Sequence, residues 1–297
     1  MKGKNAAAYI YLLLAFMLWG SINVVSSYAT AVLSSAVVAC GRYVSGTAVL
    51  WIMARGKLKT HIDGTDIKYF IIIAVLGYYL TITFNTIGIK LSGPSAASVI
   101  NSMMPVGISI AAAAVLKERP NPVRMACIGL AIVGATIVAG DSKGTRAIGA
   151  AFMLAGLAAW SIATIYIKKM TGKYPPEVIT AYAMAMSLPI HLCAAGLDIA
   201  KNGIRAELGA VIAVLYMGIF ATGAAQYLWG KSLAALDAGT CSMFYPLQPI
   251  FSVILGRIFL NEQIRPGVYL GAAMIAFAVA ADQLWGGGKE KTAPDGV

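Results

Sequence analysis

The sequence predicts an all-α membrane protein with ten transmembrane helices, arranged as two inverted five-helix repeats around a central cavity. Three observations lead to this fold class. The chain is 59% hydrophobic and only 12% charged, whereas soluble domains carry roughly 25% charged residues. Its apolar residues gather in runs long enough to cross a bilayer. One pattern of proline, apolar residues and Leu-x-Glu occurs twice, 144 residues apart.

Ten segments fit the roughly 17–25 mostly apolar residues that a spanning helix needs, and short polar or Gly/Pro-rich breaks separate them. The first run is too long for a secretory h-region of roughly 7–15 residues, so we expect it to remain as a span. A tail at 286–297 has no apolar face and is predicted to be a disordered cytoplasmic tail. The predicted spans are 6–28, 33–54, 67–88, 94–116, 122–140, 147–168, 177–197, 207–231, 238–260 and 266–285.

The duplicated stretch reads PVGISIAAAAVLKERPNP at 105–122 and PIFSVILGRIFLNEQIRP at 249–266. Five spans precede the junction between the copies and five follow it. Because five is odd, the second copy enters the bilayer from the opposite side. The predicted repeats cover 1–140 and 141–285, and such inverted repeats are typical of transporters that work by alternating access.

Two residue pairs within this stretch have structural interpretations. Pro105 and Pro249 fall midway in the fourth and ninth spans, where a proline bends a helix and serves as a joint or shapes the cavity. Glu118 and Glu262 fall at helix ends just before the next span. A carboxylate there complements the positive end of the following helix, so we expect a structural role.

Polar and aromatic residues fall on corresponding faces of the two copies. In the third span Tyr78, Ile82 and Asn85 share one helix face, and the 144-residue offset maps them onto the eighth span. An unsatisfied amide in lipid costs several kcal/mol, so a shared watery cavity is expected. The alternative is that the amides bond across packed helices and the aromatic rings form interfacial belts. The predicted substrate-binding residues are Trp19, Asn23, Tyr78, Asn85, Asn101, Trp160, Gln226, Trp229, Tyr245 and Gln248.

Arg42 is the one formal charge well inside a predicted span, and no acidic residue is visible at matching depth. A buried guanidinium usually marks a functional site. We place first a structural or gating role, in which it bonds free carbonyls near a neighbouring helix end, and second the binding of a substrate carboxylate. His191 in the seventh span is expected to be packed and hydrogen-bonded rather than a proton relay.

The predicted spans contain no residue pattern typical of an enzyme active site or a metal site. All acidic residues fall in loops, tails or span ends, which excludes paired aspartates or an H-E-x-x-H motif, so no catalytic residue is expected. The four cysteines lie in apolar runs without C-x-x-C spacing, which argues against a zinc site or a disulfide framework. We expect neither a metal nor a cofactor.

Several motifs in order carry a family resemblance: LWGSIN in the first span, CGRYVSG in the second, GLAAWSIATIYIKK in the sixth, and the two segments LKERPNPVRMACIGLAIVGATIVAG and LNEQIRPGVYLGAAMIAFAVAA, which begin within the duplicated stretch. With these motifs, residues 6–285 resemble the ten-helix EamA-type branch of the drug/metabolite transporter superfamily. The resemblance implies a bacterial inner-membrane carrier, often an exporter of amino acids or other small metabolites. It also implies that spans 1–4 and 6–9 surround the cavity, with spans 5 and 10 together at one side.

The predicted function is therefore a small-metabolite exporter or facilitator, with amino acids, including aromatic or neutral ones, as the favoured substrates. Choline-like or other quaternary ammonium compounds, held by cation–π contact, or drugs are the alternative. The net charge is +11, and most Lys and Arg residues fall in predicted loops on the same side of the membrane as the N-terminus. This bias is typical of the cytoplasmic loops of membrane proteins, so we attribute it to membrane topology rather than to nucleic-acid binding. Both termini are expected in the cytoplasm, in a multi-pass protein of the bacterial cytoplasmic (inner) membrane. Close-packing glycines on spans 5 and 10 suit a monomer or a weak homodimer.

Overall fold

The computed structural model describes residues 2–115, 121–139, 147–260 and 266–286, and every regular element among them is a helix. Nine described helices are apolar, five of them long enough to cross a membrane and four shorter. The described residues are therefore all-α, as predicted, and include five helices that could cross a membrane, while the number of ten spans stays a prediction. Glu118, Glu262 and residues 287–297 of the predicted tail lie outside the described residues. The five long helices are Ser35–Ala54, Gly64–Gly88, Ala147–Met170, Pro176–Asn202 and Leu208–Ala235.

The first half begins with two long helices, α1 (Lys2–Val32) and α2 (Ser35–Ala54). The Ser34 side chain accepts a hydrogen bond from the Val37 N–H and so caps the start of α2. After the short 3-10 turn η1 (Gly64–Asp66), the chain continues as α3 (Ile67–Ile72), the π-helical segment η2 (Ile73–Leu80) and α4 (Thr81–Ser102). The helices α5 (Met104–Val115) and α6 (Pro122–Ala139) complete this half.

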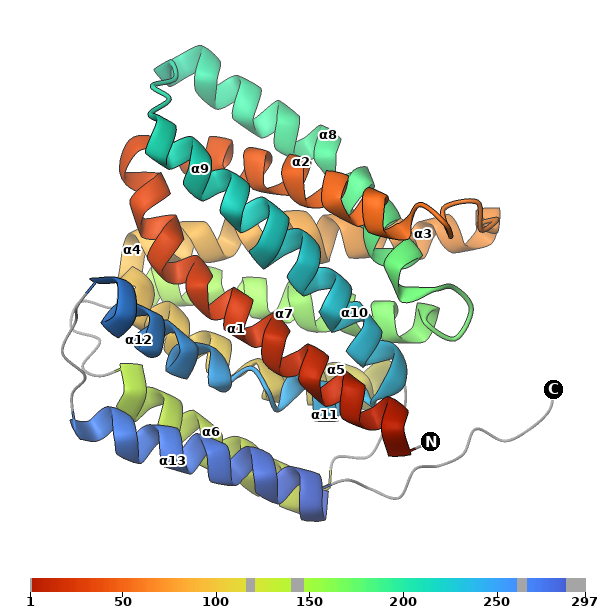
Figure 1. Ribbon diagram of the computed structural model, residues 1–297, viewed down its shortest axis with the longest axis vertical. Helices are drawn as coiled ribbons and strands as arrows, with labels where there is room; N and C mark the ends of the chain where they lie inside the picture. The colour runs from red at the N-terminus through yellow and green to blue at the C-terminus, as the bar shows by residue number, and fades with distance from the viewer. Residues whose placement is uncertain (1, 116–120, 140–146, 261–265, 287–297) are drawn as a thin grey trace.

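The second half follows the same order. It comprises α7 (Ala147–Met170), α8 (Pro176–Asn202), α9 (Leu208–Tyr216), the π-helical segment η3 (Met217–Ala224) and α10 (Ala225–Ala235). Then come α11 (Ala238–Ser242), α12 (Leu247–Leu260), α13 (Pro266–Ala281) and the π-helical segment η4 (Asp282–Gly286). The described chain begins and ends at the same end of the bundle, on the right in Figure 1.

The chain reverses direction within α4, although α4 is helical throughout. Three glycines track its course along α7: Gly77 lies against Trp160, Gly88 against Met153, and Gly107 against Leu157. The chain therefore runs toward the start of α7 and has come back by Gly107. The sequence predicts a Gly/Pro-rich break between two spans in this stretch, and the structure shows that the break is helical, since α4 continues from Thr81 to Ser102.

The 144-residue offset seen in the sequence recurs in the backbone. The π-helical segments η2 and η3 begin and end at positions related by this offset, and so do the starts of α6 and α13. Helices are also interrupted near the two prolines at which we predict bends, since α5 begins one residue before Pro105 and α12 begins two residues before Pro249. These interruptions fall where the sequence places the two prolines, and both a bend and a gating role stay predictions.

The pair α6 and α13 lies along one side of the bundle (Figure 1). A Cβ added at Gly134 of α6 would come within 2.7 Å of the Gly271 carbonyl oxygen of α13, so the two backbones approach as closely as glycine allows. The remaining helices pack around each other, with α1 beside α10 and α12, α2 beside α8 and η3, and α4 and α5 beside α7. This arrangement leaves a space that both halves of the chain surround.

Candidate functional site

A cavity of about 110 Å³ lies between the two halves of the chain. Its wall is made by helices of both halves, and no described residue of α6 or α13 contributes to it. The position of α6 and α13 outside the cavity agrees with the expectation from the family resemblance. The lining residues are Trp19, Ile22, Arg42, Tyr43, Gly77, Thr81, Ile82, Asn85, Asn101, Met104, Trp160, Gln226, Tyr245 and Gln248.

Seven of the ten predicted substrate-binding residues line this cavity: Trp19, Asn85, Asn101, Trp160, Gln226, Tyr245 and Gln248. Tyr78 and Trp229 do not. Both are buried, and their rings pack behind the wall, Tyr78 against Trp160 and Trp229 against Trp19 and Tyr245. The side chain of Asn23 in α1 is not among those that the structure describes. Substrate binding by any of these residues stays a prediction.

Aromatic rings form one part of the wall. The indole N–H of Trp160 donates a hydrogen bond to the Tyr245 hydroxyl, which joins α7 to the turn before α12. The Trp19 ring stacks on Tyr245 with centroids 6.0 Å apart and meets Trp160 edge-on at 6.4 Å. Phe16 packs edge-on against both Trp19 and Tyr245 from behind. The rings therefore hold one another in place and present a rigid apolar surface to the cavity.

Amide side chains form another part of the wall. The Gln248 amide nitrogen donates to the Trp19 carbonyl at 3.3 Å, and Ser252 donates to the Gly20 carbonyl at 2.7 Å, so α12 lies tightly along α1. The amide oxygens of Asn85 and Gln226 are buried and accept no hydrogen bond from any described residue. A buried acceptor without a donor is costly, so these two oxygens are the groups here that would gain from a hydrogen-bonding ligand.

Arg42 also lines the cavity. Its Nε donates to the Thr222 hydroxyl at 2.8 Å, across the contact between α2 and η3. The expected hydrogen bonds from Arg42 to backbone carbonyls are not seen among the described residues, and no described carboxylate pairs with it. The structural interpretation that we placed first therefore accounts for only one of its five N–H groups.

The cavity residues that sequence reasoning missed are Ile22, Tyr43, Gly77 and Thr81. Gly77 belongs to η2, and Thr81 directly follows it. A π-helical segment has a wider turn than the 3.6-residue period on which the face prediction depended. Tyr78 consequently turns away from the cavity and Gly77 turns toward it. No signal in the sequence marks this segment as π-helical.

His191 packs behind the cavity wall, as expected. Its ring stacks on Tyr43 with centroids 4.4 Å apart, and its Nε2 lies 3.0 Å from the Tyr78 carbonyl oxygen. Among the residues that the structure describes, no three His, Cys, Asp or Glu side chains are grouped so that they could hold a metal ion.

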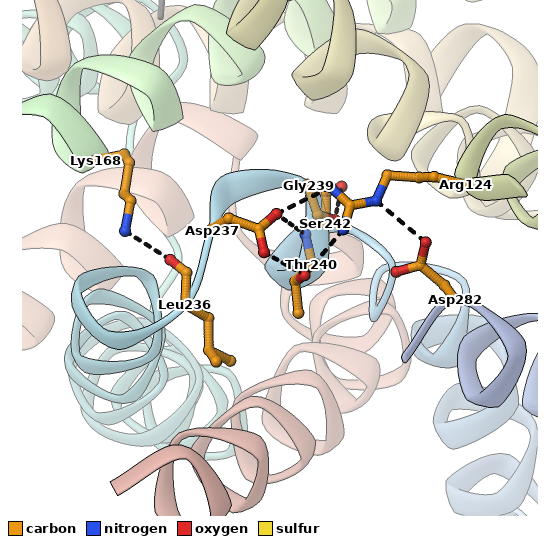
Figure 2. Close-up of polar contacts among 8 residues, drawn as sticks. All are labelled: Arg124, Lys168, Leu236, Asp237, Gly239, Thr240, Ser242 and Asp282. Atoms are coloured by element: carbon orange, nitrogen blue, oxygen red, sulfur yellow. Dashed lines mark hydrogen bonds and ion pairs between the residues drawn. The ribbon is translucent and has the colours of Figure 1, made fainter. Parts of the chain in front are cut away.

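Ion pairs join the two halves at one end of the molecule. Figure 2 shows the most buried of these clusters, centred on Arg124 at the start of α6. The Arg124 guanidinium donates to Asp237 at 2.9 Å, to Asp282 at 3.1 Å and to Thr240 at 3.1 Å. Asp282 is fully buried, whereas Asp237 is half-exposed and also caps α11 through the Thr240 N–H. Sequence reasoning counted Arg124 only as a loop charge and missed this cluster.

Two further clusters lie at the same end, where α2 ends and α8 begins. Glu177 at the start of α8 receives hydrogen bonds from Lys57 at 2.5 Å and from Lys231 at 3.1 Å. Lys173, in the loop between α7 and α8, pairs with Asp63 and with Asp66. The hydrogen bond from Glu177 raises the pKa of Lys57. The described ion pairs thus all gather at this end, the one at which the described chain begins and ends.

Comparisons with known proteins place these features in a family. The model of the EamA-like transporter family matches residues 6–140 and again residues 147–281. An uncharacterized transporter of Archaeoglobus fulgidus is 24% identical over 273 residues, covering 91% of this chain and 96% of that protein. A riboflavin transporter of Rhizobium johnstonii is 31% identical over 176 residues, 59% of this chain and 56% of its own. One solved crystal structure has the same fold, with a TM-score of 0.77 at 18% identity over 94% of this chain and 97% of its own.

Proposed function

The chain belongs to the EamA-like transporter family, so it is a membrane transporter of small molecules, and we propose that it carries amino acids, including aromatic or neutral ones, by alternating access. It works as an exporter or facilitator in the bacterial cytoplasmic membrane. Its ten spans form two inverted five-helix repeats, residues 1–140 and 141–285, with both termini in the cytoplasm. The central cavity between the halves is the substrate site.

The observation that carries this proposal is the composition of the cavity wall. Aromatic rings lie on one part of it, neutral amides on another, and one guanidinium completes it, with no carboxylate among its described residues. An aromatic amino acid has matching parts, since its ring suits the rings and its charged ends suit the polar groups. The cavity volume of about 110 Å³ is below the roughly 300–1,000 Å³ of sites for drug-sized ligands.

Choline-like cations fit this wall less well. The rings of Trp19, Trp160 and Tyr245 supply the cation–π surface that such a substrate needs. Arg42 in the same wall, however, repels a ligand with a fixed positive charge and no negative one, and no carboxylate of the described lining offsets it. Riboflavin, named for one relative, has neither a carboxylate nor an ammonium group, so it offers no partner to the guanidinium in this wall.

Alternating access has a physical basis in the ion pairs that join the two halves at one end of the molecule. Movement of one half against the other would have to break contacts that join them there, including Arg124 with Asp237 and Lys57 with Glu177. Such contacts stabilise this end and would be exchanged for others when the protein opens toward that side. The wall of the cavity offers no described carboxylate to take up a proton, so we propose facilitated diffusion or exchange rather than proton coupling.

Counterflow in proteoliposomes tests the proposal. Vesicles loaded with unlabelled tryptophan, phenylalanine, threonine, choline or riboflavin are diluted into a trace of the same labelled compound, with and without a pH gradient. We expect amino acids to accumulate and an imposed pH gradient to change net flux less than twofold. Counterflow of choline or riboflavin without any amino acid would overturn the substrate class, and flux that follows the pH gradient would overturn the uncoupled mechanism.

A further inference from the structure

We propose that Arg42 is the anchor for a carboxylate group of the substrate, held in position by Thr222. The inference rests on the proposed function, because it assigns one wall residue of the cavity to one chemical group of the transported molecule. Of the two roles that the sequence leaves open for Arg42, it selects the second and makes Arg42 a specificity-determining residue.

The first argument is electrostatic. Arg42 lies in the apolar interior of a membrane protein, where a guanidinium is costly unless it is paired or reaches a cavity. No described Asp or Glu pairs with it, and among described residues only the Thr222 hydroxyl receives one of its hydrogen bonds. The N–H donors of the two Nη groups therefore have no acceptor among the described residues. A planar pair of N–H donors matches a carboxylate in bidentate geometry.

The second argument is that Arg42 is held rigidly. A Cβ added at Gly218 of η3 would come within 2.8 Å of the Arg42 carbonyl oxygen, and one added at Gly46 would come within 2.9 Å of the Thr222 side chain. The α2 and η3 backbones thus lie as close as glycine permits, and this contact brings Thr222 to Arg42. Because Nε is fixed by Thr222, the rest of the guanidinium has a defined direction, as a binding group requires.

The third argument concerns the other end of an amino acid. Asn85 and Gln226 line the same cavity as Arg42, and their amide oxygens have no donor among the described residues. The terminal amide torsion of these side chains is soft, so either oxygen can turn toward a ligand. An α-ammonium group would supply the missing donors. The cavity therefore contains a cation for a carboxylate, acceptors for an ammonium and rings for an apolar side chain.

The experiment compares ligands that differ only in the carboxylate or the amine. Binding of tryptophan, tryptamine and indole-3-propionate to purified protein is measured for the wild type and for Arg42→Gln, Arg42→Lys and Thr222→Val. Tryptamine lacks the carboxylate, and indole-3-propionate lacks the amine. The matched control is Arg55→Gln, which removes an exposed positive charge at the end of the same helix. Melting without ligand shows whether each variant is folded.

We expect Arg42→Gln to weaken the binding of tryptophan and of indole-3-propionate about tenfold to a hundredfold, the range for a hydrogen bond to a charged group. Tryptamine should be unchanged or bind more tightly. For the same two ligands, Arg42→Lys should keep part of the binding affinity, and Thr222→Val should bind about three- to tenfold more weakly than the wild type. Arg55→Gln should bind all three ligands as the wild type does.

Two failures can be told apart. If the wild type binds none of the carboxylate-bearing ligands and counterflows no amino acid, the proposed function is wrong, and the anchor with it. If the wild type binds tryptophan but Arg42→Gln weakens tryptophan and tryptamine equally, or weakens neither, the cavity is a substrate site and the anchor is wrong. Should Arg42→Gln not fold, the ligand ratio in Arg42→Lys decides, because a carboxylate anchor predicts a selective loss there too.

Discussion

Removal of Arg124 should destabilise the protein far more than removal of its exposed aspartate partner. Arg124 is 13% exposed, and its partner Asp282 is fully buried, with one carboxylate oxygen that accepts no hydrogen bond from any described group. In Arg124→Met, Asp282 would remain in the interior without its cation. Breaking a buried pair in this way costs about 3–5 kcal/mol of unfolding free energy.

Asp237, the second aspartate that pairs with Arg124, provides a comparison with the buried Asp282. Asp237 is 45% exposed, and a solvent-exposed pair contributes about 0–1 kcal/mol. Asparagine also caps helices well, so Asp237→Asn should keep most of the cap on α11 and cost less than about 1 kcal/mol. The double variant Arg124→Met/Asp282→Asn has no unpaired buried charge, so we expect it to recover at least half of the loss.

The assay is reversible unfolding in mixed detergent micelles, monitored by the fluorescence of the five tryptophans. The wild type, Arg124→Met, Asp282→Asn and the double variant form a double-mutant cycle, which isolates the interaction between Arg124 and Asp282. The reasoning is refuted if the double variant is as unstable as Arg124→Met, or if Asp237→Asn costs as much as Arg124→Met. Either result would mean that the buried charge of Asp282 does not determine the stability of this end.

Three further predictions concern other parts of the molecule. Gly218→Ala should cost about 1–3 kcal/mol in the same unfolding assay, because the new Cβ would collide with the Ser45 side chain of α2; an unchanged stability would contradict the close contact. Trp160→Ala should weaken tryptophan binding about tenfold, since it removes a ring from the cavity wall, whereas Trp285→Ala in the exposed part of η4 should not. Lys173→Met should destabilise the protein at pH 7, with a difference from the wild type that disappears on acidification. A hydrogen bond from Lys173 lowers the pKa of Asp66, so the contribution is present above the ordinary pKa of an aspartate and is lost as the pH falls through the lowered one; a difference in stability that does not shrink as the pH falls would contradict it.

Much of the candidate site could be predicted because its signals are local or periodic. Trp19 and Trp160 fall near the middle of apolar runs, and Asn101 and Gln248 are amides within such runs, where lipid cannot satisfy them. Helical periodicity then placed Asn85 and Gln226 on corresponding faces. All six line the cavity.

Two predicted residues lie behind the wall, and a physical cause is visible for one of them. Tyr78 is assigned to the cavity by counting in steps of an α-helix, but it lies in the π-helical η2, where the turn is wider. Gly77 reaches the cavity in its place, and hydrophobic pattern alone does not report such a turn. Trp229 lies after the equivalent segment η3 with its ring against Phe16, although Gln226 on the same helix lines the cavity as predicted.

By itself the sequence determined the helical membrane class, the doubled pattern and the polar faces. These depend on composition and on spacing along one helix, where the chain's own hydrogen bonds and the exclusion of water from lipid decide the result. The tertiary structure decided which side of each helix meets which neighbour. Arg42 donates a hydrogen bond to Thr222, which is 180 residues away in the sequence, and Arg124 donates one to Asp282, which is 158 residues away. Such pairs depend on how far helices rotate and how closely their glycines let them approach, which is a property of packing between segments and of no segment alone.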